Sequence, residues 1–205
     1  MKHNYLLYII LFFIVLFRGP FIVLINNIGS LLFIKDESLE VNVLKSKIKN
    51  LELEYNSLID FKNNINIKEE YIITNLYMNN YSFDKLLING DNYNINDEVV
   101  NNEGLIGLIK ETYLGYSEVE FIYNTNIAVK INDAEGKIVG KTDDNNLIIK
   151  QLSNYNNINI NDKVISTYNT YIGKVIKINK LDVDTSIIVE TVNLKNNHYV
   201  AVLSR

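Results

Sequence analysis

The hydrophobic and polar positions along the chain change period twice, which divides the chain into three stretches. The first stretch is apolar: Tyr5 to Phe17 carry no charged side chain, and after "RGP" the apolar character resumes as Phe21 to Ile25. An α-helix rises about 1.5 Å per residue, so a helix that reaches residue 25 spans a hydrocarbon core about 30 Å thick, whereas the first run alone covers roughly 20 Å. We therefore predict a membrane anchor within residues 1–25 and leave its boundary around Arg18 to Pro20 open.

The residues that flank this apolar stretch predict its orientation. Lys2 and His3 precede it, and acidic side chains follow it at Asp36, Glu37 and Glu40. Positive charge favours the cytoplasmic side, so we expect a short cytoplasmic N-terminus and an extracytoplasmic location for the bulk of the chain. A cleaved signal peptide is the alternative, although no A-x-A-like cleavage site follows the run.

The second stretch has the seven-residue period of a coiled coil. Its apolar residues are spaced alternately three and four positions apart, with lysine and glutamate on the other faces. We predict a linker and a coiled-coil helix over residues 26–65 and self-association through the apolar seam; a single amphipathic helix lying on its own domain is the alternative. Membrane tethering would help the pairing, because it raises the effective concentration of the two helices. The seam consists of Val41, Leu44, Ile48, Leu51, Tyr55 and Leu58.

From about residue 67 the period changes to that of strands. Short β-branched and aromatic runs alternate with turns rich in Asn, Asp and Gly, and no helical pattern lies between them. Many short strands without intervening helices favour a sandwich or a barrel built on antiparallel pairs. The predicted strands cover residues 69–78, 84–89, 97–100, 105–110, 118–123, 127–132, 137–140, 146–152, 162–167, 171–179, 185–192 and 199–203.

A motif recurs within this third stretch. "NINDEVV" at residues 94–100 returns as "NINDKVI" at residues 159–165, and each copy is followed by an Ile-Gly pair. The shared order and nearly equal spacing predict two related β units, each with a polar turn, a strand, a connection and a glycine-bearing strand. Chance matching in a chain rich in Asn and Ile is the alternative.

The segment "EGKIVGKTDD", Glu135 to Asp144, resembles a phosphate-binding loop at first sight. That loop needs four residues between its glycines and a helix after its Lys-Thr, whereas here three residues separate the glycines and a strand pattern follows. A glycine inside a strand pattern marks a bulge, a bend or a close backbone approach. We therefore predict structural roles, without nucleotide binding, for the glycines Gly104, Gly107, Gly136, Gly140 and Gly173.

Composition removes most classes of chemistry. The 205 residues include no cysteine and two histidines, His3 and His198, so thiolate zinc sites lack their ligands and a catalytic triad in the folded region would have to use His198. A formal net charge of −4 gives no basic surface for nucleic acid. Asp97 and Asp162 lie in Asn-rich turns, where a carboxylate accepts local backbone hydrogen bonds. We expect no catalytic residue, no cofactor and no metal.

Several short motifs follow the anchor in a fixed order. "LEVNVLKSKI" carries an E-x-N-x-L-K pattern from Glu40 to Lys45, and "INDEVVNNEGLIGLIKE" places a polar turn before a Val strand and a G-L-[IV]-G pattern that starts at Gly104. "GKIVGKTDDNNLIIKQL", "NDKVISTYNTYIGKVIKI" and "HYVAVL" follow. Together with the anchor and the coil, these motifs resemble the MreC family, the bacterial rod shape-determining proteins, over nearly the whole chain.

The resemblance implies a mainly β fold, in which a transmembrane helix and a coiled-coil helix precede two small six-stranded-type β-barrels. We expect the first barrel over residues 66–115 and 166–205, with the second inserted at roughly 116–165. The resemblance also implies a non-enzymatic scaffold of the cell-elongation machinery, held in the cell membrane by a single span, that organises peptidoglycan synthesis outside the membrane.

The implied partners are a second copy of the chain, MreD, RodA, a class B penicillin-binding transpeptidase and, indirectly, MreB filaments. Two rival classes remain. A periplasmic adaptor of an export system also combines one span, a coil and β-barrels, although its β segments typically lie on both sides of a coiled hairpin. A β-barrel hydrolase is the enzyme rival, and its chemistry would have to use His198.

Overall fold

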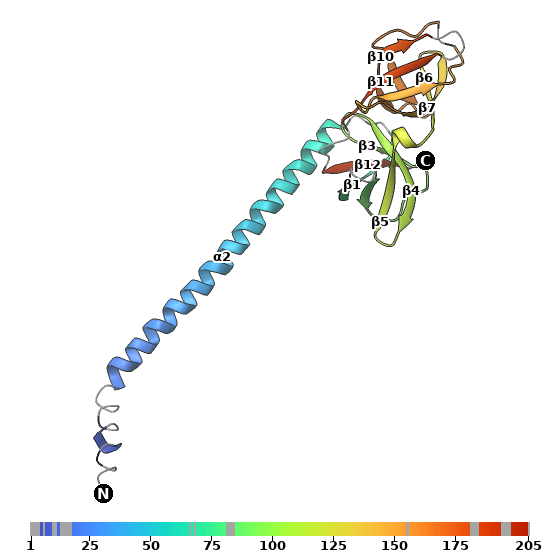
Figure 1. Ribbon diagram of the computed structural model, residues 1–205. Helices are drawn as coiled ribbons and strands as arrows, with labels where there is room; N and C mark the ends of the chain where they lie inside the picture. Colours follow the sequence, from blue (N-terminus) through green and yellow to red (C-terminus); the bar gives the residue numbers. More distant parts are fainter. Residues whose placement is uncertain are drawn as a thin grey trace. The chain divides into compact units, whose positions relative to one another are not determined.

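The computed structural model of the chain (Figure 1) describes residues 5, 7–9, 12, 18–65, 67, 69–80, 85–154, 156–180, 185–193 and 198–204. Contacts within the chain divide it into two compact units, Met1–Asn56 and Ser57–Arg205. The first unit is helical where it is described, and the second contains the end of that helix and all the described strands.

Helix α2 runs without a break from Arg18 to Asn64. We expected a linker and a coiled-coil helix over residues 26–65, whereas the helix continues through residues 26–40 without a separate linker. Those residues contain no proline and a single glycine, and their leucines, glutamates and lysine favour a helix. Among the residues that the structure describes, no helix is both long enough and apolar enough to cross a membrane. The predicted anchor run, Tyr5 to Phe17, lies mostly outside those residues.

The β region contains a strand within or overlapping each of the predicted runs, together with one short 3-10 helix, η2. Alternating burial along strands such as β2 and β7 shows why the period-2 pattern predicted them. The elements are β1 (Tyr71–Asn80), β2 (Lys85–Asn89), β3 (Glu98–Val100), β4 (Leu105–Tyr113), β5 (Tyr116–Phe121), η2 (Ile122–Asn124), β6 (Ala128–Ile131), β7 (Ala134–Lys141), β8 (Leu147–Lys150), β9 (Lys163–Ser166), β10 (Tyr171–Asn179), β11 (Ser186–Thr191) and β12 (Tyr199–Leu203).

These strands close into two antiparallel barrels of six strands each. The order around the first barrel is β1, β12, β3, β4, β5 and β2, and the order around the second is β10, β11, β8, β7, β6 and β9. The strands of the second barrel are consecutive in the sequence and lie between β5 and β12 of the first. The predicted mainly β fold with two six-stranded barrels is therefore confirmed.

The strand memberships differ from the predicted ends of the inserted barrel, about 116 and 165. β5 pairs with β2 and β4 and so completes the first barrel, whereas β10 and β11 belong to the second. The spacing of the apolar runs does not contain this information, because membership depends on pairing between strands far apart in the sequence. β3, for example, pairs with β12 through Val99 and Val202.

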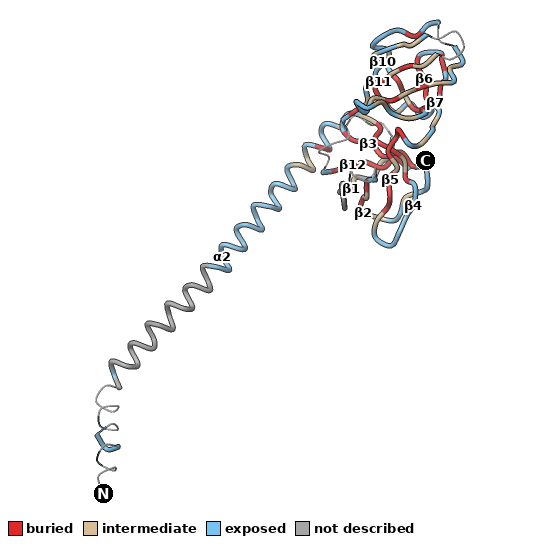
Figure 2. The backbone as a smooth tube through the Cα atoms, viewed as in Figure 1, coloured by how far each residue is buried: buried red, intermediate tan, exposed pale blue. Residues whose placement is uncertain are grey.

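Each barrel is filled by the inward side chains of its own strands, which appear as the buried segments in Figure 2. Ile88, Ile109 and Val119 are fully buried in the first barrel, and Ile138 and Ile149 are fully buried in the second. Full burial of one such side chain stabilises the fold by about 1.5–3 kcal/mol. The last turns of α2 add to the core, because Phe61 is buried and its ring lies 6.2 Å from that of Tyr199 on β12.

The two copies of the repeated motif form the same turn in the two barrels. In the first copy the Asp97 carboxylate accepts the N–H of Asn94 at 2.8 Å; in the second the Asp162 carboxylate accepts the N–H of Asn159 at 2.7 Å. The asparagine before each aspartate has a φ of 73° and donates its N–H to the following long strand, to β4 and to β10 respectively. The predicted pair of related β units is confirmed, and the acidic residues serve the turns.

The equivalence extends around both barrels. Adding six to each strand number of the first barrel, and replacing β12 by β6, reproduces the order of the second. The register shifts also correspond: β1–β2 and β7–β8, β3–β4 and β9–β10, and β4–β5 and β10–β11 are each interrupted by a bulge. The first barrel is therefore a circularly permuted copy of the second, with its closing strand moved to the end of the chain.

Candidate interaction surfaces

The predicted coiled-coil seam lies on an exposed part of α2. Its residues from Val41 to Tyr55 are between 46 and 64% exposed, so the described chain leaves most of their apolar surface open. Leu58, the last predicted seam residue, instead packs partly buried against the barrel core. The apolar stripe that a second helix would bury in a coiled coil therefore consists of Val41, Leu44, Ile48, Leu51 and Tyr55.

Gly107 and Gly173 occupy equivalent positions in the two barrels. A Cβ atom on Gly107 would lie 2.2 Å from the carbonyl oxygen of Glu120, and one on Gly173 would lie 2.1 Å from that of Glu190. A backbone atom of the neighbouring strand cannot be displaced without breaking the ladder. These two glycines are required by the close approach of two strands.

Gly136 and Gly140 lie in β7, so the segment that resembles a phosphate-binding loop is a strand. Gly140 has a φ of +153° beside a bulge in the β7–β8 pairing, with no atom near the place of a Cβ. Gly136 leaves room for the side chains of Ile149 and Leu152. The predicted glycine-bent strand is present.

The turn before β4 connects the two barrels through a set of contacts that we call the barrel clamp. The side-chain oxygen of Asn101 accepts the N–H groups of Glu103 and Gly104, both at 2.9 Å, while its amide nitrogen donates to the carbonyl of Asn193 at 2.8 Å. Asn193 in turn donates its N–H to the Glu103 carboxylate at 2.7 Å. Asn193 lies on the segment that leaves the second barrel, so this network joins one barrel to the exit of the other.

Two further contacts complete the barrel clamp. The Thr170 hydroxyl donates to the buried carboxylate of Glu98. Gly104 lies against the β9–β10 hairpin so closely that a Cβ would fall 2.3 Å from the carbonyl oxygen of Tyr171. Gly104 therefore allows a close backbone approach, and the strand pattern in the sequence does not show that this approach is to the other barrel.

A cleft of about 650 Å³ opens beside the barrel clamp. Both barrels line it, because its walls include the turn from Asn101 to Gly104 and the hairpin from Tyr168 to Tyr171. Among the described residues, no group of three or more His, Asp or Glu side chains is placed to hold a metal ion, in this cleft or elsewhere.

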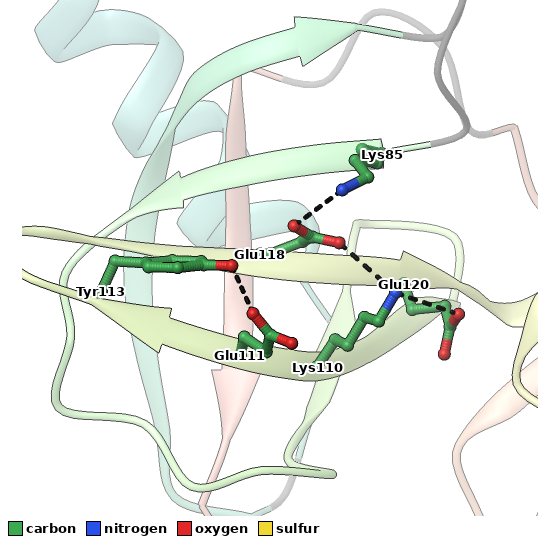
Figure 3. Close-up of polar contacts among 6 residues, drawn as sticks. All are labelled: Lys85, Lys110, Glu111, Tyr113, Glu118 and Glu120. Carbon is green, nitrogen blue, oxygen red and sulfur yellow. Dashed lines mark hydrogen bonds and ion pairs between the residues drawn. The ribbon is translucent and has the colours of Figure 1, made fainter.

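A cluster of charged residues covers the outer face of β2, β5 and β4 in the first barrel (Figure 3). Glu118, on the central strand, accepts Lys85 at 3.1 Å from one side and Lys110 at 3.6 Å from the other. Lys110 also lies 3.7 Å from Glu120. The Glu118 side chain is 9% exposed, so these two lysines compensate for a carboxylate that is largely removed from water.

Three tyrosines continue this face toward the tip of the β4–β5 hairpin and form what we call the tyrosine ridge. The ring of Tyr116 stacks between its two neighbours, 5.9 Å from Tyr77 and 4.9 Å from Tyr113, with interplanar angles of 15° and 19°. The Tyr113 hydroxyl donates to the carboxylate of Glu111, and this hydrogen bond raises the pKa of Tyr113 to about 12. Leu114 follows at the tip and is 96% exposed.

Sequence reasoning did not single out this face. Its charged residues come from three strands, and no spacing in the sequence places Lys85 next to Glu118. The one available signal is "YLGY" at residues 113–116, where two tyrosines surround a leucine and a glycine in a hairpin turn.

Comparisons with known proteins agree with this architecture. A family model described as "Rod shape-determining protein MreC, barrel core" matches residues 78–204. No curated protein matches the sequence.

Several solved structures have the same fold. MreC from Listeria monocytogenes is 21% identical, with a TM-score of 0.60, and the match covers 84% of this chain and 94% of that one. The major periplasmic domain of "the cell shape-determining filament MreC" is 20% identical, with a TM-score of 0.58 and coverage of 66% and 98%. The complex between PBP2 and MreC from Helicobacter pylori contains a chain that is 17% identical, with a TM-score of 0.54 and coverage of 66% and 98%. Because the family model spans most of both barrels and more than half of the 205 residues, the chain belongs to the MreC family of rod shape-determining proteins.

Proposed function

We propose that the protein is a non-enzymatic scaffold of the cell-elongation machinery, anchored in the cell membrane, that organises peptidoglycan synthesis on the outer side. The family match across the barrel core is the observation that carries this proposal. Two rigid barrels joined by the barrel clamp suit a scaffold, because they present fixed surfaces to several partners at once.

The chemistry of the described side chains agrees with a role without catalysis. His198 is the one described histidine, and the aspartates of the two repeated turns accept backbone N–H groups. A hydrolase would need a nucleophile, a base and an oxyanion site within reach of one another.

We propose that two copies of the chain pair through the exposed stripe on α2. Leu51 and Leu53 provide a matched pair, because they are 63% and 60% exposed but only Leu51 lies on the seam. In sedimentation of residues 30–205, Leu51→Lys should shift the chain toward monomer, and Leu53→Lys should not. A wild-type chain that remains monomeric at all micromolar concentrations would contradict this pairing.

MreC from Helicobacter pylori forms a complex with the penicillin-binding protein PBP2. We propose a class B penicillin-binding transpeptidase as a partner of this chain as well, with MreD, RodA and, indirectly, MreB as further members of the same assembly. The tyrosine ridge and the cleft beside the barrel clamp are two described surfaces that suit such contacts.

Depletion of the protein in its native cell tests the function. We expect cells that lose their shape and become round while division continues, and restoration of the shape by the wild-type gene. Normal shape together with a defect in export would favour an adaptor of an export system instead. Hydrolysis by the purified protein that disappears in His198→Ala would favour the enzyme class.

A further inference from the structure

The duplication of the barrel separates residues that the fold requires from residues that it does not. Turns, bulges and close-approach glycines are the same in both barrels, so folding demands them. The bulge of β1 carries Tyr77 and the bulge of β4 carries Lys110, whereas the equivalent positions of β7 and β10 carry Val139 and Ile176. The positions equivalent to Tyr113 and Tyr116 carry Asn179 and Ser186, although an ion pair persists between Lys174 and Glu190 at 2.9 Å. The same framework therefore forms without the aromatic ridge, and the ridge of the first barrel calls for a different explanation.

The tip of this face is held in place. Gly115 has a φ of +85°, a conformation that other residues rarely adopt, and it donates its N–H to the Asp91 carboxylate at 3.0 Å. Its carbonyl accepts the N–H of Gly90, also at 3.0 Å. These contacts fix the turn that presents Leu114, and Figure 2 shows the tip of the β4–β5 hairpin as exposed. A turn whose backbone is already fixed loses little further backbone freedom when a partner covers it.

The surroundings of the tyrosine ridge are acidic. Among the described residues around the ridge there are two lysines, Lys85 and Lys110, and four carboxylates, which gives these six residues a formal charge of −2. Both lysines are engaged by Glu118 or Glu120, so they offer little attraction to an anionic partner. The carboxylates are those of Asp91, Glu111, Glu118 and Glu120.

We propose that the tyrosine ridge and Leu114 are the site at which this scaffold binds the penicillin-binding transpeptidase, through an apolar pocket on that protein surrounded by lysine or arginine. This inference rests on the proposed function for the identity of the partner. The charge complementarity decides between occupants: an anionic lipid surface and a second, equally acidic copy of the face are both repelled. A glycan would stack on tyrosine faces but has no use for an aliphatic leucine at the tip. Tyrosine is enriched among the residues that dominate binding energy at protein interfaces.

The test uses the full-length chain in detergent micelles, titrated with the purified extracytoplasmic part of the transpeptidase from the same organism. Leu114→Ser and Tyr77→Ala should each raise the dissociation constant by about tenfold, which corresponds to roughly 1.4 kcal/mol. Each has a matched control on the second barrel. Ile160→Ser changes an exposed aliphatic residue in a turn, and Val139→Ala changes the bulge residue equivalent to Tyr77; both should leave the dissociation constant within about twofold.

Thermal unfolding of each variant confirms that the barrels are intact, which we expect because Leu114 makes almost no buried contact. Binding of the wild-type chain with an unchanged dissociation constant in both ridge variants overturns this inference and leaves the proposed partner in place. The inference is also overturned if Leu114→Ser alters self-association or vesicle binding while transpeptidase binding persists. Failure of the wild-type chain to bind contradicts the proposed partner itself and, with it, this site.

Discussion

Residues at equivalent positions of the two barrels can have the same physical role. A Cβ atom on Gly107 or on Gly173 would lie at nearly the same distance from the carbonyl oxygen of Glu120 or of Glu190. The requirement for glycine therefore arises from the barrel framework and not from one local sequence. Gly140 has a different reason, because it has open space around it and an unusual φ. One residue type thus serves two physical needs.

Replacing either close-approach glycine by alanine should destabilise the fold strongly. Gly107→Ala and Gly173→Ala force the backbone of the neighbouring strand apart, and we expect a loss of about 3 kcal/mol or more in the free energy of unfolding. Gly140→Ala meets no atom and strains φ alone, so a loss of about 1–3 kcal/mol is expected. Urea denaturation followed by circular dichroism measures both. An equal or greater loss in Gly140→Ala would contradict the explanation by close approach.

The hydrogen bond between Tyr113 and Glu111 predicts that the stability of the fold depends on pH in the alkaline range. The hydrogen bond to Glu111 raises the pKa of Tyr113 from 10.0 to about 12, so the stability that it contributes is complete below pH 10 and is lost as the pH rises to about 12. Ultraviolet titration of the wild type against Tyr113→Phe isolates the phenolate signal of this residue. Glu111→Gln should move that signal toward lower pH, and an unchanged titration would contradict the assignment.

At the scale of elements, α2 has two different surfaces. Up to Tyr55 its apolar stripe is exposed, whereas its last turns, from Ser57 onward, belong to the compact unit of the barrels. Phe61 contributes most to this attachment, because it is 6% exposed and its ring lies near that of Tyr199. The end of the helix is thus part of the first barrel's core.

Phe61→Ala should therefore destabilise the barrels by about 3 kcal/mol, since it leaves a cavity against β12. Leu51→Ala removes a side chain of similar character from the exposed stripe and should change the stability of the barrels by less than about 0.5 kcal/mol. Thermal unfolding of the two variants compares them directly. Equal melting temperatures would contradict the attachment through Phe61.

The strands could be predicted from the sequence, but their partners could not. Strand β7 shows the period of 2, with buried and exposed residues alternating from Ala134 to Val139, because each barrel faces water on one side. The repeat was visible because Asp97 and Asp162 make the same local turn. The place of β5, the barrel clamp and the charged face all depend on contacts between distant segments. Asn101 meets Asn193 across 92 positions, and no local pattern records this.

At the scale of the whole molecule, the barrel clamp determines whether the two barrels behave as one body. Asn101 is central, since it is buried and satisfies two N–H groups and a carbonyl that would otherwise lose their partners. The neighbouring Asn102 is exposed and provides a control of the same residue type.

Asn101→Ala should lower the free energy of unfolding by about 2–3 kcal/mol, because the backbone groups that bond to the Asn101 side chain lose these hydrogen bonds. We expect the unfolding transition to lose cooperativity and limited proteolysis to cut between the barrels, near Asn193. Asn102→Ala should leave both unchanged. A single cooperative transition in Asn101→Ala, with wild-type resistance to protease, would contradict the role of the barrel clamp.

The position of β12 has a consequence for how the protein is made. Synthesis supplies the strands in order, so β6 to β11 can close into the second barrel while the first still has a gap between β1 and β3. Those two strands keep unpaired edges until β12, the last of the described strands, enters between them. The barrel that begins first is therefore finished last, and we expect a chain interrupted before Tyr199 to expose two unpaired strand edges, which promote aggregation.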